Sequence, residues 1–338
     1  MHSSAFRRVL CRQVRTLPKK QLPVPSAEKR LDIAIIGSPN AGKSVLLNQL
    51  IKTRVAAVSK KKHTTRSEIL GVYNFRNIQL AFYDTPGFVR DQDSQRLDTK
   101  TLKSIVTSAT AKADVVLLVV DSVAHISDRV KMVFTEMVKM ALDSAKTEVI
   151  LVLNKVDLVE PKAQLLDITF EYVSLINGVK LKPDEQNLAC LDTTTFMVAA
   201  LHNDGLIDIK NYLLSLAKRR PWAIARDRGV TALTLHQRVE EAVLQALLDH
   251  THEEVPYVAD IECEKIKALT QTRSLVEVTV MVDNGAQQKI IIGHQGRTLV
   301  KLRQVACELL EEMMGKEIIL TFNVRIRGDD TDRQGNEK

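Results

Sequence analysis

The stretch Gly37-Ser38-Pro39-Asn40-Ala41-Gly42-Lys43-Ser44 decides the fold of this chain. It has the form GxxxxGK[ST] and lies between an apolar run, Leu31–Ile36, and a run of helical character, Val45–Ile51. Glycines at these positions let the backbone wrap around a phosphate, and the start of a helix adds positive potential there. The alternative is an ordinary glycine-containing turn, which would match the pattern by chance in about one chain of this length in a hundred. The stretch therefore predicts a phosphate-binding loop.

Short apolar runs alternate with helix-length segments on the C-terminal side of this loop. Such a pattern predicts βαβ units and a mainly parallel sheet, in which ligands bind at the carboxyl ends of the strands. The predicted strands are Leu31–Ile36, Ile78–Tyr83, Val115–Val120, Val149–Leu153 and Phe196–Leu201. The residues that follow these runs are therefore the candidates for the site.

A second motif, Asp84-Thr85-Pro86-Gly87, follows the second predicted strand. A carboxylate at a strand end beside phosphates can hold the shell of a Mg²⁺ ion through water. The N–H of Gly87 can meet a γ-phosphate, and the freedom of glycine lets the loop move when that phosphate leaves. Alone this turn means little, but its position after a phosphate loop indicates a nucleoside triphosphate site.

The fourth predicted strand leads into Asn154-Lys155-Val156-Asp157. A carboxylate can accept hydrogen bonds from N1–H and the exocyclic amine of guanine, and adenine offers neither donor in that place. A site that binds in this way discriminates by ~10⁴–10⁵. A polar helix cap is the alternative for such a tetrapeptide, but the two preceding phosphate motifs favour guanine specificity.

Composition and charge exclude several classes of protein. Of the 338 residues, 45% are hydrophobic and 26% are charged, which is a globular balance with room for about two domains. The four cysteines form no CxxC pair, so zinc fingers and a disulfide scaffold are not expected. No apolar run approaches the ~20 residues of a membrane helix, so no transmembrane segment is expected.

The net charge of +7 is spread unevenly. Residues 1–27 contribute +6, residues 28–228 contribute +6 and residues 229–338 contribute −5, so overall basicity does not by itself predict nucleic-acid binding. Residues 1–27 are Arg-rich, free of acidic residues and apolar at helical spacing. This pattern predicts a mitochondrial transit peptide; a disordered basic tail on a cytosolic protein is the alternative.

A second domain follows the basic, proline-broken segment 218–228, which contains Trp222 and is typical of an interdomain linker. Its predicted elements are a helix over Thr234–Leu248, two strands over Tyr257–Lys265 and Ser274–Val282, a strand ending at Ile292 and a helix over Thr298–Met314.

Between the last two elements lies a GxxG motif, Gly293-His294-Gln295-Gly296. Small glycines let a nucleic-acid backbone approach closely, and the following helix start favours phosphate. An isolated GxxG is most often a turn, but this placement resembles the KH signature, whose groove clamps about four nucleotides. Since the domain is acidic overall, we expect RNA to meet one locally basic edge. The candidate RNA-binding residues are Lys289, Gly293, His294, Gln295, Gly296, Arg297, Lys301 and Arg303, with Arg325 and Arg327 as further members of the edge.

The ordered motifs of the whole chain resemble those of the Era family of GTPases. They are GSPNAGKS, Thr64-Thr65-Arg66, DTPG, NKVD and Val198-Ala199-Ala200-Leu201, and the resemblance covers nearly all of residues 31–328. It implies an α/β P-loop GTPase domain with a mainly parallel sheet (28–217), the linker (218–228), a smaller α+β type II KH domain (229–328) and a polar tail (329–338).

The resemblance also assigns roles to single residues. It places Lys43, Thr65 and Gly87 in catalysis, and Ser44, Thr65 and Asp84 around Mg²⁺. The residues that it implies for binding GTP or GDP are Gly37, Asn40, Ala41, Gly42, Lys43, Ser44, Val45, Asp84, Gly87, Asn154, Lys155, Asp157, Ala199, Ala200 and Leu201. The backbone N–H of Ala200 is expected to contact guanine O6.

The sequence departs from the usual pattern of such enzymes in two places. Phe88 stands where Ras-like enzymes carry a glutamine that orients the attacking water, and a phenyl ring cannot do this. Slow intrinsic hydrolysis is therefore expected, raised by a bound partner. A backbone group, another water, a monovalent cation or that partner could align the attacking water, and the resemblance to related GTPases with an asparagine like Asn40 implies K⁺ as the cation. Ala199 replaces the usual serine, so the side-chain support of that hydroxyl is lost.

These features predict a GTP-hydrolysing switch of the mitochondrial matrix that binds small-subunit mitochondrial rRNA near its 3′ end and assists assembly of the small ribosomal subunit. A monomer is expected, and the resemblance leaves room for peripheral association with the inner membrane. The alternative is a structural RNA-binding assembly protein with little or no GTP turnover. The presence of Lys43, Ser44, Asp84 and Asp157 favours the enzyme.

Overall fold

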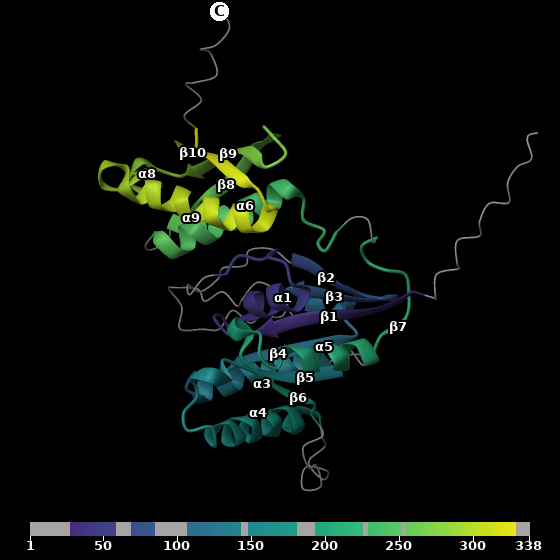
Figure 1. Ribbon diagram of the computed structural model, residues 1–338. Coiled ribbons are helices and arrows are strands. Elements are labelled where there is room, and N and C mark those ends of the chain that lie inside the picture. The colour runs from purple at the N-terminus through teal and green to yellow at the C-terminus, as the bar shows by residue number, and fades with distance from the viewer. Residues whose placement is uncertain are drawn as a thin grey trace, which may run out of the picture.

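A seven-stranded sheet forms the centre of the first domain (Figure 1). The computed structural model describes residues 28–58, 69–84, 107–142, 148–180, 193–225, 229–251 and 255–328. The strand order is β2-β3-β1-β4-β5-β6, with β7 beside β1. All neighbours in this path are parallel except the β2–β3 pair, so the mainly parallel sheet is confirmed. The strands are β1 (Lys29–Gly37), β2 (Ile69–Phe75), β3 (Ile78–Asp84), β4 (Val115–Asp121), β5 (Glu148–Asn154), β6 (Thr195–Val198) and β7 (Lys218–Arg219).

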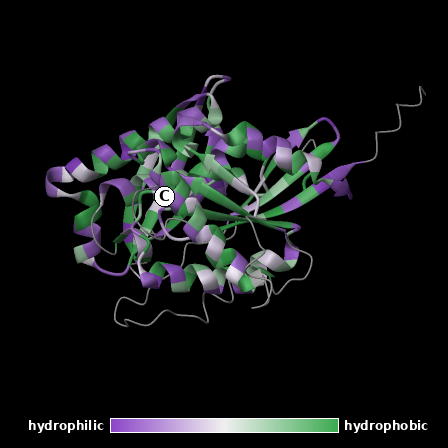
Figure 2. Ribbon diagram, turned by 90° about the horizontal axis from the view of Figure 1, so that it is seen from below, coloured by the Kyte–Doolittle hydropathy of each residue, from purple (hydrophilic) through white to green (hydrophobic). Residues whose placement is uncertain are grey.

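The two faces of this sheet bury separate hydrophobic clusters, because successive side chains of a strand point to opposite faces. Leu31, Ile33 and Ile35 of β1 lie in the cluster shared with α1 (Lys43–Ile51) and α5 (Leu206–Ser215). Their neighbours Ala34 and Ile36 lie in the other cluster, which is shared with α3 (Asp128–Leu142) and α4 (Gln164–Lys180). Figure 2 shows the hydrophobic strands inside and the mixed surfaces of the helices outside.

Two predicted strands differ from the structure. Strand β6 ends at Val198, and Ala200–His202 form a short 3₁₀ helix, η2, instead of continuing the predicted strand to Leu201. This turn follows a backbone bridge between Ala199 and Asp204. The sequence analysis does not include strand β2, which pairs antiparallel with β3. The two strands are joined by a turn in which Arg76 has a positive φ of 53°.

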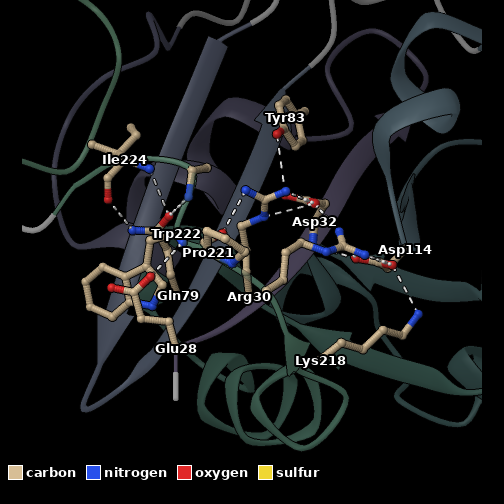
Figure 3. Close-up of polar contacts among 12 residues, drawn as sticks. Glu28, Arg30, Asp32, Gln79, Tyr83, Asp114, Lys218, Pro221, Trp222 and Ile224 are labelled. Atoms are coloured by element: carbon tan, nitrogen blue, oxygen red, sulfur yellow. Dashed lines mark hydrogen bonds and ion pairs between the residues drawn. The ribbon is translucent and has the colours of Figure 1, made fainter. Parts of the chain in front are cut away.

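The first half of the predicted linker is bound to the first domain rather than free (Figure 3). Strand β7 pairs with the start of β1. Arg220 donates to Asp32 and Asp114, two carboxylates at the N-terminal end of the sheet. The side chain of the buried Gln79 accepts from the backbone of Ala223 and Ile224 and donates to Ile224 O. These contacts fix residues 218–225 against the sheet.

The second domain packs helices on a three-stranded sheet of order β10-β9-β8, in which β9 is parallel to β10 and antiparallel to β8. Its core includes Val276, Val278 and Val280 of β9. This α+β arrangement agrees with the predicted KH fold. Its elements are α6 (Leu235–His250), α7 (Val255–Val258), β8 (Asp260–Ala268), β9 (Arg273–Val282), α8 (Gly285–Ile292), the 3₁₀ turn η4 (His294–Gly296), α9 (Arg297–Met314) and β10 (Glu317–Ile326).

The apolar run before the GxxG motif is a helix, so the prediction of a strand ending at Ile292 is wrong. Asn284 caps α8, because its side chain accepts from the backbone N–H groups of Ala286 and Gln287. Similarly, the predicted strand from Tyr257 begins only at Asp260, because Val255–Val258 form the short helix α7. Within the described ranges, no helix is both long and apolar enough to cross a bilayer.

Candidate functional site

The phosphate loop connects β1 to α1 at the carboxyl edge of the sheet, and two of its glycines have no room for a side chain. A Cβ on Gly37 would lie 2.2 Å from the carbonyl oxygen of Val119 in β4. Gly42 has a φ of +89°, and a Cβ there would lie 2.3 Å from Nδ2 of Asn154. At these two glycines the loop approaches β4 and the end of β5 too closely for a residue with a side chain.

Lys43 begins α1, and its ammonium turns back over the loop. Its Nζ donates to the carbonyl oxygen of Ser38 at 2.9 Å. Burial lowers the pKa of Lys43, and the nearby charge of Asp84 opposes this shift. A desolvated ammonium at this loop gains strongly from a bound phosphate, which would supply an opposite charge.

Ser44 and Asp84 supply oxygen ligands of the kind that Mg²⁺ prefers. The Ser44 hydroxyl donates to Oδ2 of Asp84 at 2.9 Å, and Asp84 is fully buried at the end of β3. This pair fits a Mg²⁺ ion held by the hydroxyl directly and by the carboxylate through water. When bound, the ion neutralises phosphate charge. Of the other predicted residues of the phosphate site, Ala41 is buried, Val45 is half-buried, and Asn40 is exposed with a φ of 63°.

Thr65 and Gly87, which were assigned to catalysis, lie outside the described residues, as do Thr85, Pro86 and Phe88. The predicted leader 1–27 and tail 329–338 lie outside them too.

Asn154 joins the phosphate loop to the predicted base-binding loops. It ends β5 and is 3% exposed. Its Nδ2 donates to Ala41 O at 2.8 Å, and its Oδ1 accepts from Ala200 N at 3.0 Å. Three segments far apart in the sequence thus meet on one amide. The Ala200 N–H that was expected to contact guanine O6 already has a partner here, so it can reach the base only by sharing that donor.

Lys155 is held beside the predicted base site by an acidic residue that the sequence analysis missed. Its Nζ lies 2.6 Å from Oδ2 of Asp121, and its backbone has a φ of 64°. Asp121 ends β4, so the rule that ligands collect at the carboxyl ends of parallel strands could have identified it. The ion pair restrains the lysine stem, which we expect to lie over the base plane.

Asp157 lies in the 3₁₀ turn η1 (Val156–Leu158) and is accessible for a base. Nε2 of His202 lies 3.5 Å from its Oδ2, a neighbour that the sequence analysis also missed. Ala199 is buried at the end of β6, whereas Leu201 is 71% exposed. The structure therefore gathers the backbone around Ala199 and Ala200 at the site and leaves the Leu201 side chain in solvent.

The GxxG motif forms the tight connection between α8 and α9. Gly293 has a φ of +72°, and a Cβ there would lie 2.1 Å from Oγ1 of Thr298. Gly296 has a φ of +76° and faces open space. His294 and Gln295 between them are exposed. The loop can therefore accept a close backbone at Gly296, directly before the N-terminus of α9.

The predicted basic edge is only partly gathered. Lys289, Arg297, Lys301 and Arg303 are all exposed, and Arg297 and Lys301 share a face of α9 because they are four residues apart. Arg303 lies on the flank that carries Cys307, whose Sγ contacts Ile318 O of β10. Arg303 thus lies away from the Arg297–Lys301 face.

Arg327, the last member of the predicted edge, is neutralised by its neighbours. Its guanidinium pairs with Asp260 at 2.7 Å and with Asp283, and donates to Val258 O at 2.8 Å. These contacts tie the end of β10 to β8 and to the start of α8. Arg325 remains an exposed cation on the same strand. We therefore keep Arg325 and set Arg327 aside as a candidate for binding RNA.

Comparisons with known proteins agree with this geometry. Residues 32–155 match the family described as 50S ribosome-binding GTPase. The chain is 30% identical to GTPase Era of Brucella suis over 89% of this chain and 90% of that protein. It is also 30% identical to the GTP-binding protein ERG of Arabidopsis thaliana, over 89% of this chain and 66% of the relative.

Two solved structures are similar over the same span. One is Era in complex with MgGDPNP and nucleotides 1506–1542 of 16S ribosomal RNA, at a TM-score of 0.71, 27% identity, and coverage of 89% of this chain and 95% of that one. The other is a single-residue variant of Aquifex aeolicus Era bound to GDP·AlF4⁻, with the same TM-score and coverage at 28% identity. The match thus includes both domains, and this chain, a GTP-hydrolysing enzyme, belongs to the Era family of GTPases.

Proposed function

We propose that this GTPase binds the 3′ end of small-subunit mitochondrial rRNA through its KH domain and assists assembly of the small mitochondrial ribosomal subunit in the matrix. The observation that carries the proposal is that one chain joins a guanine-nucleotide site, organised around Asn154, to a GxxG loop open at Gly296. A similar Era structure holds 16S ribosomal RNA and MgGDPNP together. The leader at residues 1–27 supports the mitochondrial location.

In hydrolysis, different residues of the site would bind the phosphates and the metal ion. Lys43, whose ammonium lies over the loop, would bind and orient the phosphates, while Ser44 and Asp84, already in contact, would hold Mg²⁺. Positioning and charge neutralisation supply most of the catalysis in phosphoryl transfer. Because Phe88 cannot orient water, the proposal includes slow intrinsic hydrolysis that K⁺ beside Asn40 or bound RNA accelerates. Turnover in potassium and in sodium buffers tests the cation.

Single-turnover hydrolysis of GTP, with and without an RNA oligonucleotide of the rRNA 3′ end, tests the proposed function. We expect slow hydrolysis by the protein alone and a faster rate with RNA. Fast hydrolysis by the protein alone that RNA does not change would contradict the proposal. A complete lack of turnover under all conditions would favour the structural RNA-binding alternative.

The location and the target are tested in cells. Residues 1–27 fused to a fluorescent reporter should direct it to mitochondria, whereas the same segment with its six basic residues changed to glutamine should not. Cross-linking followed by sequencing of the attached RNA should recover the small-subunit rRNA 3′ end next to Gly293–Gly296. Recovery of other RNA classes, or cytosolic location of the reporter, would contradict the corresponding part of the proposal.

A further inference from the structure

Residues 53–58 lead from α1 toward Thr65, which the resemblance to Era GTPases places in switch I, the segment that contacts Mg²⁺ in the GTP state. Residues 59–68, which include Thr65, lie outside the described residues, and we call them the switch segment. Asn48 of α1 fixes the first part of this connection. Its Oδ1 accepts from the backbone N–H groups of Val55 and Ala56 at 3.0 and 3.1 Å, and its Nδ2 donates to Ala56 O at 2.9 Å. Because α1 begins at the phosphate loop, these contacts make residues 55 and 56 part of the nucleotide-binding domain.

The next two backbone N–H groups point to the other domain. Ala57 N donates to Oε2 of Glu241 at 3.2 Å, and Val58 N donates to Oε1 of Gln245 at 3.2 Å. Glu241 and Gln245 are four residues apart on α6, so they lie on one face of that helix. We call this pair the α6 latch. The acceptor therefore changes from the first domain to the second between residues 56 and 57.

The α6 latch lies in a closely packed interface. Nη1 of Arg54 donates to the same Oε1 of Gln245 at 3.0 Å, and its Nη2 lies 3.5 Å from Oε2 of Glu312 on α9. Ala57 is 2% exposed, and Gln245 is 8% exposed. A cavity lined by residues 54–57 and by Glu241 and Gln245 measures about 10 Å³, which is about the space of one water molecule. Ala57 therefore has little room to move against α6.

The other end of the switch segment also meets the second domain. Strand β2 begins at Ile69, and Thr231 Oγ1 donates to Leu70 O at 2.7 Å. Val72 N donates to Val230 O at 2.7 Å. The described residues on both sides of the switch segment are thus hydrogen-bonded to residues beyond 228.

We propose that the α6 latch is the contact that transmits the nucleotide state from the switch segment to the KH domain. The inference rests on the proposed function and adds the residues that carry its coupling. Val58 directly precedes the switch segment in the chain. A change in the segment with the bound nucleotide therefore acts on the N–H groups of Ala57 and Val58, which then either keep their acceptors on α6 or exchange them for others. Since a coupling free energy acts equally in both directions, RNA bound to the KH domain biases the switch segment through the same bonds.

Amide hydrogen exchange in the unmodified protein gives a test with an internal control. Exchange of the Ala57 and Val58 amides should differ between the GDP and GDPNP complexes, because their acceptors lie on α6. The Val55 and Ala56 amides, held by Asn48 within one domain, should exchange alike in both complexes. If the four amides respond alike, the α6 latch does not separate the two domains and the proposal is overturned.

Coupling itself is measured as the ratio of the dissociation constants of a labelled RNA, of the rRNA 3′-end sequence, in the GDP and GDPNP complexes. The double variant Glu241→Met with Gln245→Met removes both acceptors while nearly keeping side-chain volume. It should move the ratio about 5- to 30-fold toward one, within the usual range of coupling between sites. Asp249→Asn, which changes an exposed carboxylate on the same helix, should keep the wild-type ratio.

The outcomes distinguish the latch from the proposed function. If the wild-type ratio is one, the proposed coupling and the latch both fail. If the wild-type ratio differs from one and the double variant keeps it, only the latch fails. Gln245→Met alone, a milder change, should give an intermediate ratio; an unchanged ratio in this variant would also count against the latch.

Discussion

Replacing Asn154 by alanine should break the link between the phosphate loop and the base-binding loops. The side chain is 3% exposed, and it satisfies the carbonyl of Ala41 and the N–H of Ala200, which are themselves buried. A buried polar group left without its partner costs about 1–3 kcal/mol, so two such groups predict a loss of about 2–6 kcal/mol in the free energy of unfolding. Total stability is about 5–15 kcal/mol, so this is a large part of it.

Guanidinium unfolding of Asn154→Ala and wild type would measure this loss, with Gln304→Ala on the exposed face of α9 as the control. Calorimetric titration with GDP should show affinity reduced by tenfold or more, since each 1.4 kcal/mol of lost preorganisation is about a factor of ten. A change in stability below about 0.5 kcal/mol, the range of ordinary surface substitutions, would refute the reasoning that this amide holds the site together.

Three further predictions concern the base site, the RNA loop and the linker. Asp157→Asn should lower affinity for GDP and raise affinity for xanthosine diphosphate, because an amide matches the donor and the acceptor that xanthine presents. Titration with both nucleotides measures this, and an unchanged preference for GDP would exclude Asp157 from base recognition. Gly296→Asp should abolish RNA binding, through charge repulsion and backbone strain at φ +76°, and leave GTP affinity unchanged. Loss of both RNA binding and GTP binding, measured by filter binding, would contradict the view that the two domains bind their ligands separately. For Asp114, burial alone would raise the pKa, but hydrogen bonds from Asp32 and Lys218 and the charge of Arg220 lower it below 3.8. The ionised carboxylate therefore stabilises the fold above that pH and loses this effect as the pH falls through its lower folded pKa. Asp114→Asn should thus reduce the melting temperature more at pH 7 than at pH 3, and an equal reduction at both would contradict the ion pair.

The parallel sheet was predictable because its central strands are buried on both faces. Val115–Val120 is an unbroken apolar run, and its neighbours are similar, so strand type and approximate ends followed from the sequence. The motifs after these runs then fell at one edge of the sheet. Strand β2 escaped prediction because it is an antiparallel edge strand of mixed composition, Ile69–Phe75, which only its pairing with β3 defines.

Tertiary and capping interactions decided what the sequence pattern could not. The β-branched run Ile290–Ile292 favours a strand by propensity, but the Asn284 cap and the packing of Ile291 into the core make it a helix. Likewise, nothing local in the sequence indicates that Gln245 would accept from Val58, nearly two hundred residues earlier. Long-range side-chain to backbone bonds of this kind depend on how the domains pack.

Control of RNA binding by the bound nucleotide is tested most simply by the affinity of the wild-type protein for the rRNA 3′-end oligonucleotide, measured by fluorescence polarisation once with GDPNP and once with GDP. We predict two clearly different dissociation constants, because nucleotide state and RNA binding are linked through one chain. Equal constants, measured with both nucleotides saturating the site, would contradict this link.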